Sequence, residues 1–430
     1  MSLGTLTAGM GSHSPGLGSL TAGIGVVWPG LQGGSSTPPG PVAPTTPVAR
    51  QTWAAGVRLN GLADNPFGPG SIRNFRVKIR NLTGQAVSDV SFDLFHHLPT
   101  SQTFEWSVGP ASGTLDSGAW ATPATVVVPG APDGIRQPGY ARIDVALASP
   151  LAPNADLVIS VNAPTSSVTF LPGLNQNAWP AYGFSQVAQM SFSPVAVDGA
   201  WPGGFDNVFS FVGGVHFHNL TGNPVIQIMH IGDSLGEMER PLATPNELGR
   251  EGFAIRGNYA EIANGRRFWW SSYSNGAFLL ENYLDRILHL IDTPWIDNVD
   301  VVSIQPLTHN SFPGSVAVAQ SQWAQVETVA NAVRAAGRGV IFTLLTPPTA
   351  PHQGADEIAA WQWIKDRIAS EPHVYLDDVV ADGTGTAIDP AYSSTISPEP
   401  IHINEAGGIV QGAVLPTRTA TALAALGYSV

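Results

Sequence analysis

Cysteine is absent from the 430 residues, and lysine occurs only at positions 78 and 365. A chain without thiols forms no disulfide and no cysteine-ligated metal site, so composition leaves its redox compartment undetermined. Charged residues make up only 12% of the chain, about half of ordinary usage, and the net charge is −13. A nucleic-acid groove needs a basic patch, and this charge balance argues against one.

Long apolar runs are also missing. The sequence has no run of about 18 apolar residues, the length that predicts a membrane-spanning helix. The apolar N-terminus lacks the basic region that begins a secretory signal, so we expect no cleaved signal peptide. Hydrophobic residues still reach 43%, enough for a substantial core, while glycine and proline number 47 and 36. This combination indicates much sheet, many loops and an extracellular or assembly-bound protein.

Residues 1–50 contain no charged side chain before Arg50 and are rich in glycine, proline, serine and threonine. Within them, LGTLTAGMG at 3–11 recurs as LGSLTAGIG at 17–25, and a stiff proline-rich linker follows. One interpretation is a disordered tail. The alternative is an arm that docks on a partner subunit, because docking would remove its leucine, methionine and isoleucine side chains from water.

Residues 51–222 have the alternating pattern of β-strands. In NFRVKIRN, Phe75, Val77 and Ile79 share one face and three basic residues share the other. DVSFDLF repeats the pattern, and further strand candidates are ARIDVALA, DLVISVNA and SVTFLP. The turn sequence NLTG occurs twice, which extends this region to about residue 222. A lone sheet would leave one face unburied, so we predict an all-β sandwich domain.

From residue 223, short apolar segments alternate with amphipathic ones. The predicted strands are VIQIMHIG, RRFWW, DVVSIQPL, GVIFTLL and HVYLDD. The predicted helices are LLENYLDRILHLI, WAQVETVANAVRAAG, DEIAAWQWIKDRIAS and a last helix that begins at EAGG. This alternation indicates an α/β domain over residues 223–430, with a parallel sheet covered on both faces. Sites in such sheets form at the carboxyl ends of the strands.

Two segments at such positions carry catalytic residue types. The first strand ends in Gly-Asp-Ser-Leu, which places Ser234 on a strand-to-helix turn that Asp233 is expected to support. A hydroxyl becomes a good nucleophile when a base takes its proton. His402, in the loop before the last helix, can be that base, and Glu399 can accept its other ring N–H. The alternatives are a helix N-cap at Ser234 and a capping or packing role for His402.

GDSL after a buried strand, together with EPIHINEAG near the C-terminus, resembles the GDSL or SGNH hydrolases over about half of the chain, residues 223–430. The resemblance implies a flavodoxin-like, three-layer α/β/α domain. It also implies that Ser234 is the nucleophile and His402 the base. Glu399 stands where the family usually has aspartate and is longer by one methylene, so backbone carbonyls are the alternative partners of His402.

The resemblance further implies an oxyanion hole. Its donors would be the backbone N–H of Ser234, a glycine in a second block and an asparagine in a third block. Gly276, in SSYSNGAF, is the candidate glycine. The third block departs from the family pattern: register places His309 at the asparagine position, whereas chemistry favours Asn310, and both remain candidates.

The implied reaction is ester hydrolysis through an acyl-enzyme, with no metal and no other cofactor. Trp269, Trp270 and Tyr273 are candidates for stacking on sugar rings, although neighbouring tryptophans more often simply pack. The histidines at 96, 97, 216 and 218 lie in strand-patterned sequence without nearby paired carboxylates, so they make a poor metal site.

An accessory β-domain before such a hydrolase suggests a carbohydrate O-acetyl esterase that acts on surface polysaccharide. The arm suggests an oligomer or an assembly, such as a phage virion whose tail carries this protein. One alternative is a secreted lipase or esterase for short acyl chains, which predicts activity on longer p-nitrophenyl esters. The other is a non-enzymatic virion or receptor-binding protein with a degenerate hydrolase domain, which predicts no ester hydrolysis.

Overall fold

The computed structural model describes residues 74–81, 83–96, 98–113, 115–134, 136–162, 187–191, 196–201, 212–218, 220–221, 225–236, 252–265, 267–274, 278–394 and 401–430. Contacts divide the chain into two units, residues 1–40 and 41–430, and all described residues belong to the second. The predicted arm and linker, residues 1–50, lie outside the described residues, as does the strand candidate SVTFLP.

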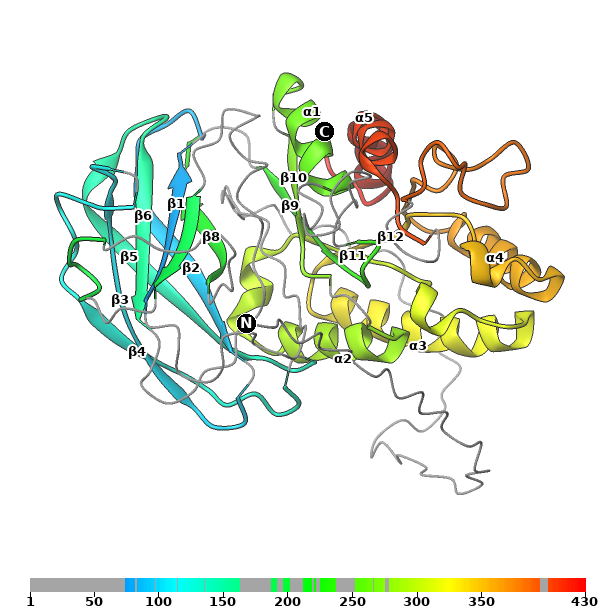
Figure 1. Ribbon diagram of the computed structural model, residues 1–430, viewed down its shortest axis with the longest axis horizontal. Coiled ribbons are helices and arrows are strands. Elements are labelled where there is room, and N and C mark those ends of the chain that lie inside the picture. The colour runs from blue at the N-terminus through cyan, green and yellow to red at the C-terminus, as the bar shows by residue number, and fades with distance from the viewer. Residues whose placement is uncertain are drawn as a thin grey trace, which may run out of the picture. The chain divides into compact units, whose positions relative to one another are not determined.

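The first eight strands form two antiparallel sheets, with the orders β4-β3-β6-β1-β7 and β5-β2-β8 (Figure 1). Their bounds are β1 (Asn74–Arg80), β2 (Val87–His96), β3 (Gln102–Pro110), β4 (Ala124–Val128), β5 (Gly139–Leu151), β6 (Asp156–Asn162), β7 (Val187–Ser191) and β8 (Val212–His218). All these strands fall within the predicted range 51–222. The strands β3, β4 and β7 are additions to those that the sequence predicts.

One apolar cluster contains side chains from both of these sheets. It includes Phe75, Val77 and Ile79 of β1 and Phe92 and Leu94 of β2, each at most 4% exposed. Alternate residues of each strand therefore meet between the sheets, as period two requires. The predicted β-sandwich is confirmed.

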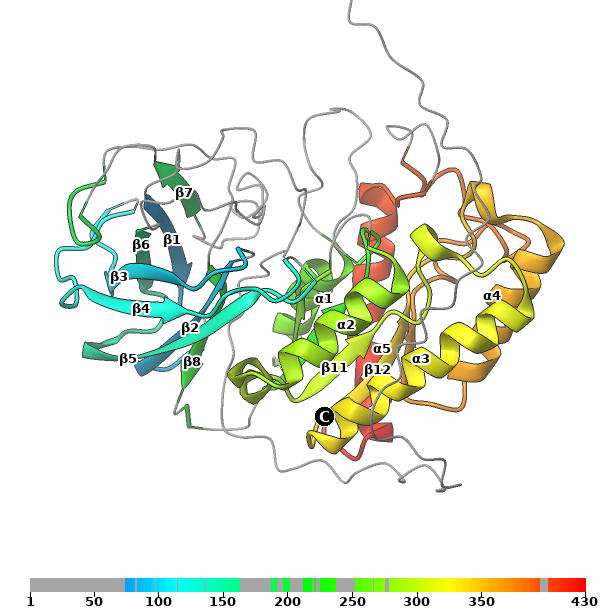
Figure 2. The ribbon, with the colours of Figure 1, turned by 90° about the horizontal axis from the view of Figure 1, so that it is seen from below.

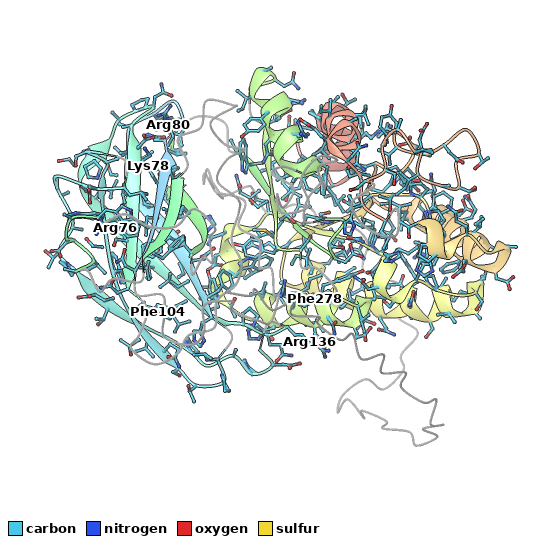
Figure 3. All side chains as sticks on the ribbon, viewed as in Figure 1. Arg76, Lys78, Arg80, Phe104, Arg136 and Phe278 are labelled. Atoms are coloured by element: carbon cyan, nitrogen blue, oxygen red, sulfur yellow. The ribbon has the colours of Figure 1, made fainter. Side chains whose placement is uncertain are left out.

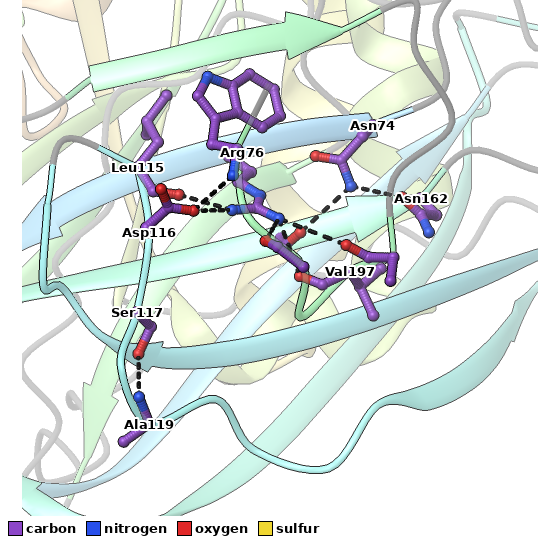
Figure 4. A network of polar contacts seen from close by, with 12 residues as sticks. Asn74, Arg76, Leu115, Asp116, Ser117, Ala119, Asn162 and Val197 are labelled. Carbon is purple, nitrogen blue, oxygen red and sulfur yellow. Dashed lines mark hydrogen bonds and ion pairs between the residues drawn. The ribbon is translucent and has the colours of Figure 1, made fainter. Parts of the chain in front are cut away.

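The basic face of β1, on which Figure 3 labels three side chains, is not simply open to solvent. Arg76 is 0% exposed. Its guanidinium donates to Asp116 Oδ1 at 2.8 Å and to the carbonyl of Gly199 at 2.5 Å (Figure 4). It also lies 4.9 Å and 5.1 Å from the ring centroids of Trp120 and Trp201. Two loops of the sandwich thus cover this side chain and supply its partners.

The remaining strands form one parallel sheet with the order β10-β9-β11-β12-β13. Their bounds are β9 (Ile226–Ile231), β10 (Phe268–Ser272), β11 (Val301–Ile304), β12 (Gly339–Leu344) and β13 (His373–Tyr375). Counted within this domain, the order is 2-1-3-4-5, which is the flavodoxin-like arrangement. The chain reverses direction of winding between β9 and β11, where such sheets open a crevice for ligands.

Helices cover both faces of the parallel sheet, and Figure 2 shows this layering. The helices are α1 (Phe253–Ala263), α2 (Leu280–Ile291), α3 (Val316–Ala335), α4 (Ala355–Ile368) and α5 (Glu405–Ala425). One core cluster joins the sheet to α2, α3 and α4, and another joins its opposite face to α1 and α5. The predicted three-layer α/β/α class is confirmed, although the sequence did not predict α1.

The helix α3 shows how local sequence sets these elements. Ser315 accepts a hydrogen bond from the backbone N–H of Val318 and caps the first turn. The predicted inward residues Trp323 and Val326 are 5% and 0% exposed. The helix ends before Gly337, whose φ of +76° suits glycine. Helix α3 therefore begins seven residues before the predicted segment and ends where the glycine predicts.

Candidate active site

Ser234 Oγ and His402 Nε2 lie 2.9 Å apart, although 168 positions separate the two residues. Ser234 is 8% exposed and His402 is 7% exposed. This distance is within the range of a hydrogen bond and matches what a serine nucleophile needs from its base. The fold thus brings together the two side chains that two distant motifs singled out.

The turn that presents Ser234 follows β9 directly. The backbone N–H of Gly236 donates to the carbonyl of Asp233 at 3.1 Å and closes the turn. Gly232 is needed for a close approach, because a Cβ there would lie 2.2 Å from Gln305 Oε1. That same oxygen accepts from the N–H of Asp233 at 3.2 Å. The side chain of Gln305, from the loop after β11, therefore packs against the backbone of the nucleophile turn.

Asp233 is 0% exposed and accepts hydrogen bonds from both sides of the crevice. Its Oδ1 accepts from Leu235 N at 2.9 Å and Gln305 Nε2 at 3.0 Å. Its Oδ2 accepts from Thr308 Oγ1 at 2.5 Å and His309 N at 3.1 Å. Burial raises the pKa of this carboxyl, and the hydrogen bonds act in the opposite direction. Asp233 supports the turn, as expected, and joins it to the third block.

The loop that carries His402 is held by backbone pairing. The N–H of Ser394 donates to the carbonyl of His402 at 2.8 Å. Asn404 Nδ2 donates to the carbonyl of Ala391 at 2.9 Å. Asn404 Oδ1 accepts from the N–H of Gly407 at 3.0 Å and so caps α5. The residue two positions after the histidine therefore fixes both its loop and the start of the last helix.

Two predicted site residues, Glu399 and Gly276, lie outside the described residues. The predicted orienting carboxylate and the predicted glycine donor therefore stay predictions. The nearest described residues before them are Ser274, two positions before Gly276, and Ser394, before Glu399.

The two candidates of the third block differ in their surroundings. Asn310 is exposed, and its Nδ2 already donates to the carbonyl of Phe278 at 3.0 Å. His309 is half-buried, and its Nδ1 lies 2.6 Å from Thr349 Oγ1. Among the described residues, Nε2 of His309 has no hydrogen-bond partner. The imidazole is therefore better placed than the amide to offer a donor to a ligand.

A second histidine lies against His309. The two rings of His309 and His352 are 4.8 Å apart, and His352 Nε2 lies 3.1 Å from the carbonyl of His309. His352 Nδ1 lies 3.0 Å from Glu357 Oε1. Burial, followed by the neighbouring His352, lowers the pKa of His309 to about 4. His309 is therefore neutral at neutral pH. The sequence did not single out Thr349, His352 or Glu357, and their place after the strand β12 was the available signal.

A hollow of about 290 Å³ lies beside the nucleophile turn at the carboxyl ends of β9, β11 and β12. His309 and Thr349 contribute polar atoms to its wall. Its apolar lining consists of Leu235, Leu307, Phe312, Leu344, Leu345 and Pro347.

The three aromatic residues predicted to contact sugar rings are buried. Trp269, Trp270 and Tyr273 are 6%, 1% and 0% exposed. The ring of Trp270 packs on Phe253 at 5.7 Å, and its Nε1–H donates to Thr419 Oγ1 at 3.1 Å. Because protein atoms cover both faces of β10, a sugar ring has no access to these side chains. This burial agrees with the favoured interpretation, that these aromatic residues pack within the fold.

The described histidines of the sandwich have structural partners. His96 Nε2 lies 3.2 Å from the carbonyl of Val128, and His218 Nε2 lies 2.6 Å from Ser91 Oγ. Within the described ranges, no group of three histidine, aspartate or glutamate side chains could hold a metal ion. No helix in the described part of the chain is long and apolar enough to cross a membrane.

No protein-family model and no curated protein matches the chain. Among solved structures, a GDSL-like lipase from Bacteroides thetaiotaomicron is 16% identical over 47% of this chain and 93% of its own, with a TM-score of 0.32. A family two carbohydrate esterase from Clostridium thermocellum, solved with cellohexaose, is 12% identical over 86% of this chain and 98% of its own, with a TM-score of 0.37.

A family two carbohydrate esterase from Cellvibrio japonicus is 11% identical over 89% of this chain and 97% of its own, with a TM-score of 0.34. One of these three neighbours is thus a GDSL-like lipase and two are carbohydrate esterases. Their similarity to this chain is low.

Proposed function

We propose that this protein is a serine ester hydrolase in which Ser234 is the nucleophile and His402 the general base. The observation that carries the proposal is the 2.9 Å approach of Ser234 Oγ to His402 Nε2 in a largely buried site. His402 takes the hydroxyl proton as Oγ attacks the ester carbonyl, and then protonates the leaving alcohol. Water, activated by the same imidazole, releases the acid from the acyl-enzyme.

The oxyanion of the tetrahedral intermediate needs preorganised donors. We assign this role to the backbone N–H of Ser234, to Gly276 and to the ring of His309. If Thr349 donates its hydroxyl proton to Nδ1, the neutral ring carries its own proton on Nε2, which is then a donor. The low pKa of His309, about 4, supports a neutral ring. Asn310 is the weaker candidate because the carbonyl of Phe278 accepts from its amide.

The proposed substrate is an O-acetyl ester of a surface polysaccharide. The hollow beside Leu235 has a mainly apolar lining, which suits a short acyl group. A short acyl group also fits a nucleophile that is only 8% exposed. The proposed setting is extracellular or on a phage particle, with residues 1–50 docked on another subunit of the assembly.

Hydrolysis of p-nitrophenyl acetate by the full chain tests the reaction. Ser234→Ala and His402→Ala should each lower kcat by at least roughly 10³-fold, because the two groups act as a unit. Acetate should be a better substrate than butyrate or octanoate. Equal rates for the wild type and both variants would refute the proposal that the protein is a serine ester hydrolase. A preference for octanoate would instead support the lipase alternative.

Three further variants test which residue of the third block is the oxyanion donor. His309→Ala should lower kcat about 100-fold or more, the loss typical of one oxyanion donor. Asn310→Ala should stay within about threefold of wild type. His309→Asn tests whether a side-chain amide can replace the ring. The reverse order of effects would assign the role to Asn310.

A further inference from the structure

Asp93 is a fully buried carboxylate on the face of β2 opposite the sandwich core. It is 0% exposed. Tyr140, from β5, donates to its Oδ1 at 2.7 Å, and His216 Nε2, from β8, lies 2.8 Å from its Oδ2. A charge at such a position is costly unless polar partners surround it. The two neighbouring strands supply only part of these partners.

Other partners come from the α/β domain. Asn298 Nδ2 lies 3.5 Å from Asp93 Oδ1. The hydroxyl of Tyr273, a residue that is 0% exposed, also hydrogen-bonds to Asp93. Burial, followed by the charge of Asp93, raises the pKa of Tyr273 well above its ordinary value, so the phenol keeps its proton and donates. A carboxylate of the sandwich is thus bonded to side chains of the neighbouring domain.

Gly214 of β8 permits this approach. A Cβ at this position would lie 3.0 Å from Asp93 Oδ2, 3.0 Å from His216 Nε2 and 3.1 Å from the hydroxyl of Tyr273. These contacts are tighter than ordinary van der Waals contact, so any side chain here would push the three groups apart. The ring of Phe95, also on β2, packs 5.8 Å from the ring of Tyr273. The junction is therefore closely packed around the tyrosine.

Tyr273 is the first residue after β10 and lies three positions before Gly276, the candidate glycine of the second oxyanion block. Its carbonyl accepts from Nη1 of the buried Arg286 at 3.0 Å, and its N–H donates to the carbonyl of His230 at 2.8 Å. The preceding residue, Ser272, donates from Oγ to the carbonyl of Gly236 at 2.8 Å. Gly236 belongs to the nucleophile turn. This short segment is thus anchored to the sandwich at one end and to the nucleophile turn at the other.

We propose that Asp93 is a positioning residue of the active site. Through the hydroxyl of Tyr273, the β-sandwich holds the end of β10, residues 272–274, against the turn that carries Ser234. This inference rests on the proposed function and extends it. The sandwich is then part of the scaffold that sets the geometry of the reaction, besides any role in binding.

The test uses Asp93→Asn, Tyr273→Phe and the double variant in the full chain. Each single change removes the charge-assisted hydrogen bond while it keeps the size of the side chain. We expect kcat for p-nitrophenyl acetate to fall at least about tenfold with KM nearly constant, since small displacements of catalytic groups have such effects. The double variant should be no worse than the poorer single variant, because both remove the same contact.

Tyr140→Phe is the matched control. It removes a hydrogen bond to the same carboxylate from within the sandwich and leaves the hydroxyl of Tyr273 in place. Its thermal stability should fall, while kcat stays within about threefold of wild type. The proposal fails if Asp93→Asn and Tyr273→Phe keep wild-type kcat, or if Tyr140→Phe loses as much kcat as they do.

A second measurement separates this inference from the proposed function. Amide hydrogen exchange of the peptide spanning 268–274 should accelerate in Asp93→Asn and stay unchanged in Tyr140→Phe. If the wild type hydrolyses no ester, the proposed function fails. The exchange rates then still show whether Asp93 holds this segment, and unchanged rates in Asp93→Asn would overturn that role.

Discussion

Arg76 and Asp93 are buried charges of opposite sign on the outer faces of the two sheets of the sandwich. Both need polar partners because they are buried, but they take these partners from different parts of the molecule. Among the described residues, Arg76 takes its partners from the sandwich alone, and these include Asp116, Gly199 and the rings of two tryptophans. Asp93 has partners in the sandwich and also Asn298 and Tyr273 in the α/β domain. The first arrangement stabilises one domain, whereas the second couples two.

The largest effect is expected from Arg76→Met. Removal of the guanidinium leaves several carbonyls without their donor, whereas the Asp116 side chain is 42% exposed and water can solvate its charge. We expect a loss of about 1–3 kcal/mol in the free energy of unfolding. The kcat of the folded variant should not change, because no partner of Arg76 among the described residues lies in the α/β domain. Urea denaturation and initial rates measure the two quantities.

Lys78→Met is the matched control for Arg76→Met. Lys78 lies on the same face of β1, and its Nζ is 4.0 Å from Asp156 Oδ2. Such a loose pair contributes at most about 1 kcal/mol. An equal loss of unfolding free energy in both variants, or a lower kcat in Arg76→Met, would contradict the conclusion that Arg76 stabilises the sandwich alone.

His230 extends the comparison to a buried group that is kept neutral. Burial lowers its pKa from 6.5 to about 3, and its Nδ1 lies 2.9 Å from Ser303 Oγ. Between these two pH values the unfolded chain binds the proton and the folded chain does not. Stability is therefore full above about pH 6.5 and declines as the pH falls toward 3, by up to about 1.4 kcal/mol per pH unit.

Urea denaturation between pH 7 and pH 4.5 measures this decline. In His230→Leu the contribution of this group disappears, so the slope of stability against pH should be shallower by up to about 1.4 kcal/mol per unit. An identical slope in the wild type and in His230→Leu would show that other groups govern the acid response.

The smallest effect concerns the independence of the two charges. Arg76 and Asp93 share no partner among the described residues, so the losses of unfolding free energy in Arg76→Met and Asp93→Asn should add to within about 0.5 kcal/mol in the double variant. A larger deviation would mean that the two sheets transmit strain between these sites. Chemical denaturation of the four proteins measures the deviation.

The sequence was sufficient to place Ser234 and His402 because both lie where the rules of parallel sheets are strong. A buried strand that ends in Gly-Asp-Ser puts the hydroxyl at the carboxyl edge. The last helix begins near the same edge, so a histidine in the loop before it reaches the same crevice. Period two likewise predicted the inward face of β1 and of β2, since each strand buries alternate residues.

Other features depend on contacts between distant segments, and no local pattern encodes them. Period two placed Arg76 opposite the core but gave no sign that two loops would cover it. The local pattern at Trp269 and Trp270 does not distinguish stacking on a ligand from packing, and in the fold both side chains are buried. The partners of Asp233, such as Gln305 and Thr308, and the contact of Thr349 with His309 arise from side chains at neighbouring strand ends, which only the folded chain brings together.

The distance along the chain between Ser234 and His402 has a consequence for biosynthesis. Ser234 is synthesised 168 residues before His402, after the strands of the sandwich and before most of the parallel sheet. A nascent chain can therefore fold its earlier parts while its serine has no proton acceptor. The hydroxyl of Ser234 gains its base only when the loop that carries His402 and the helix α5 pack onto the completed sheet.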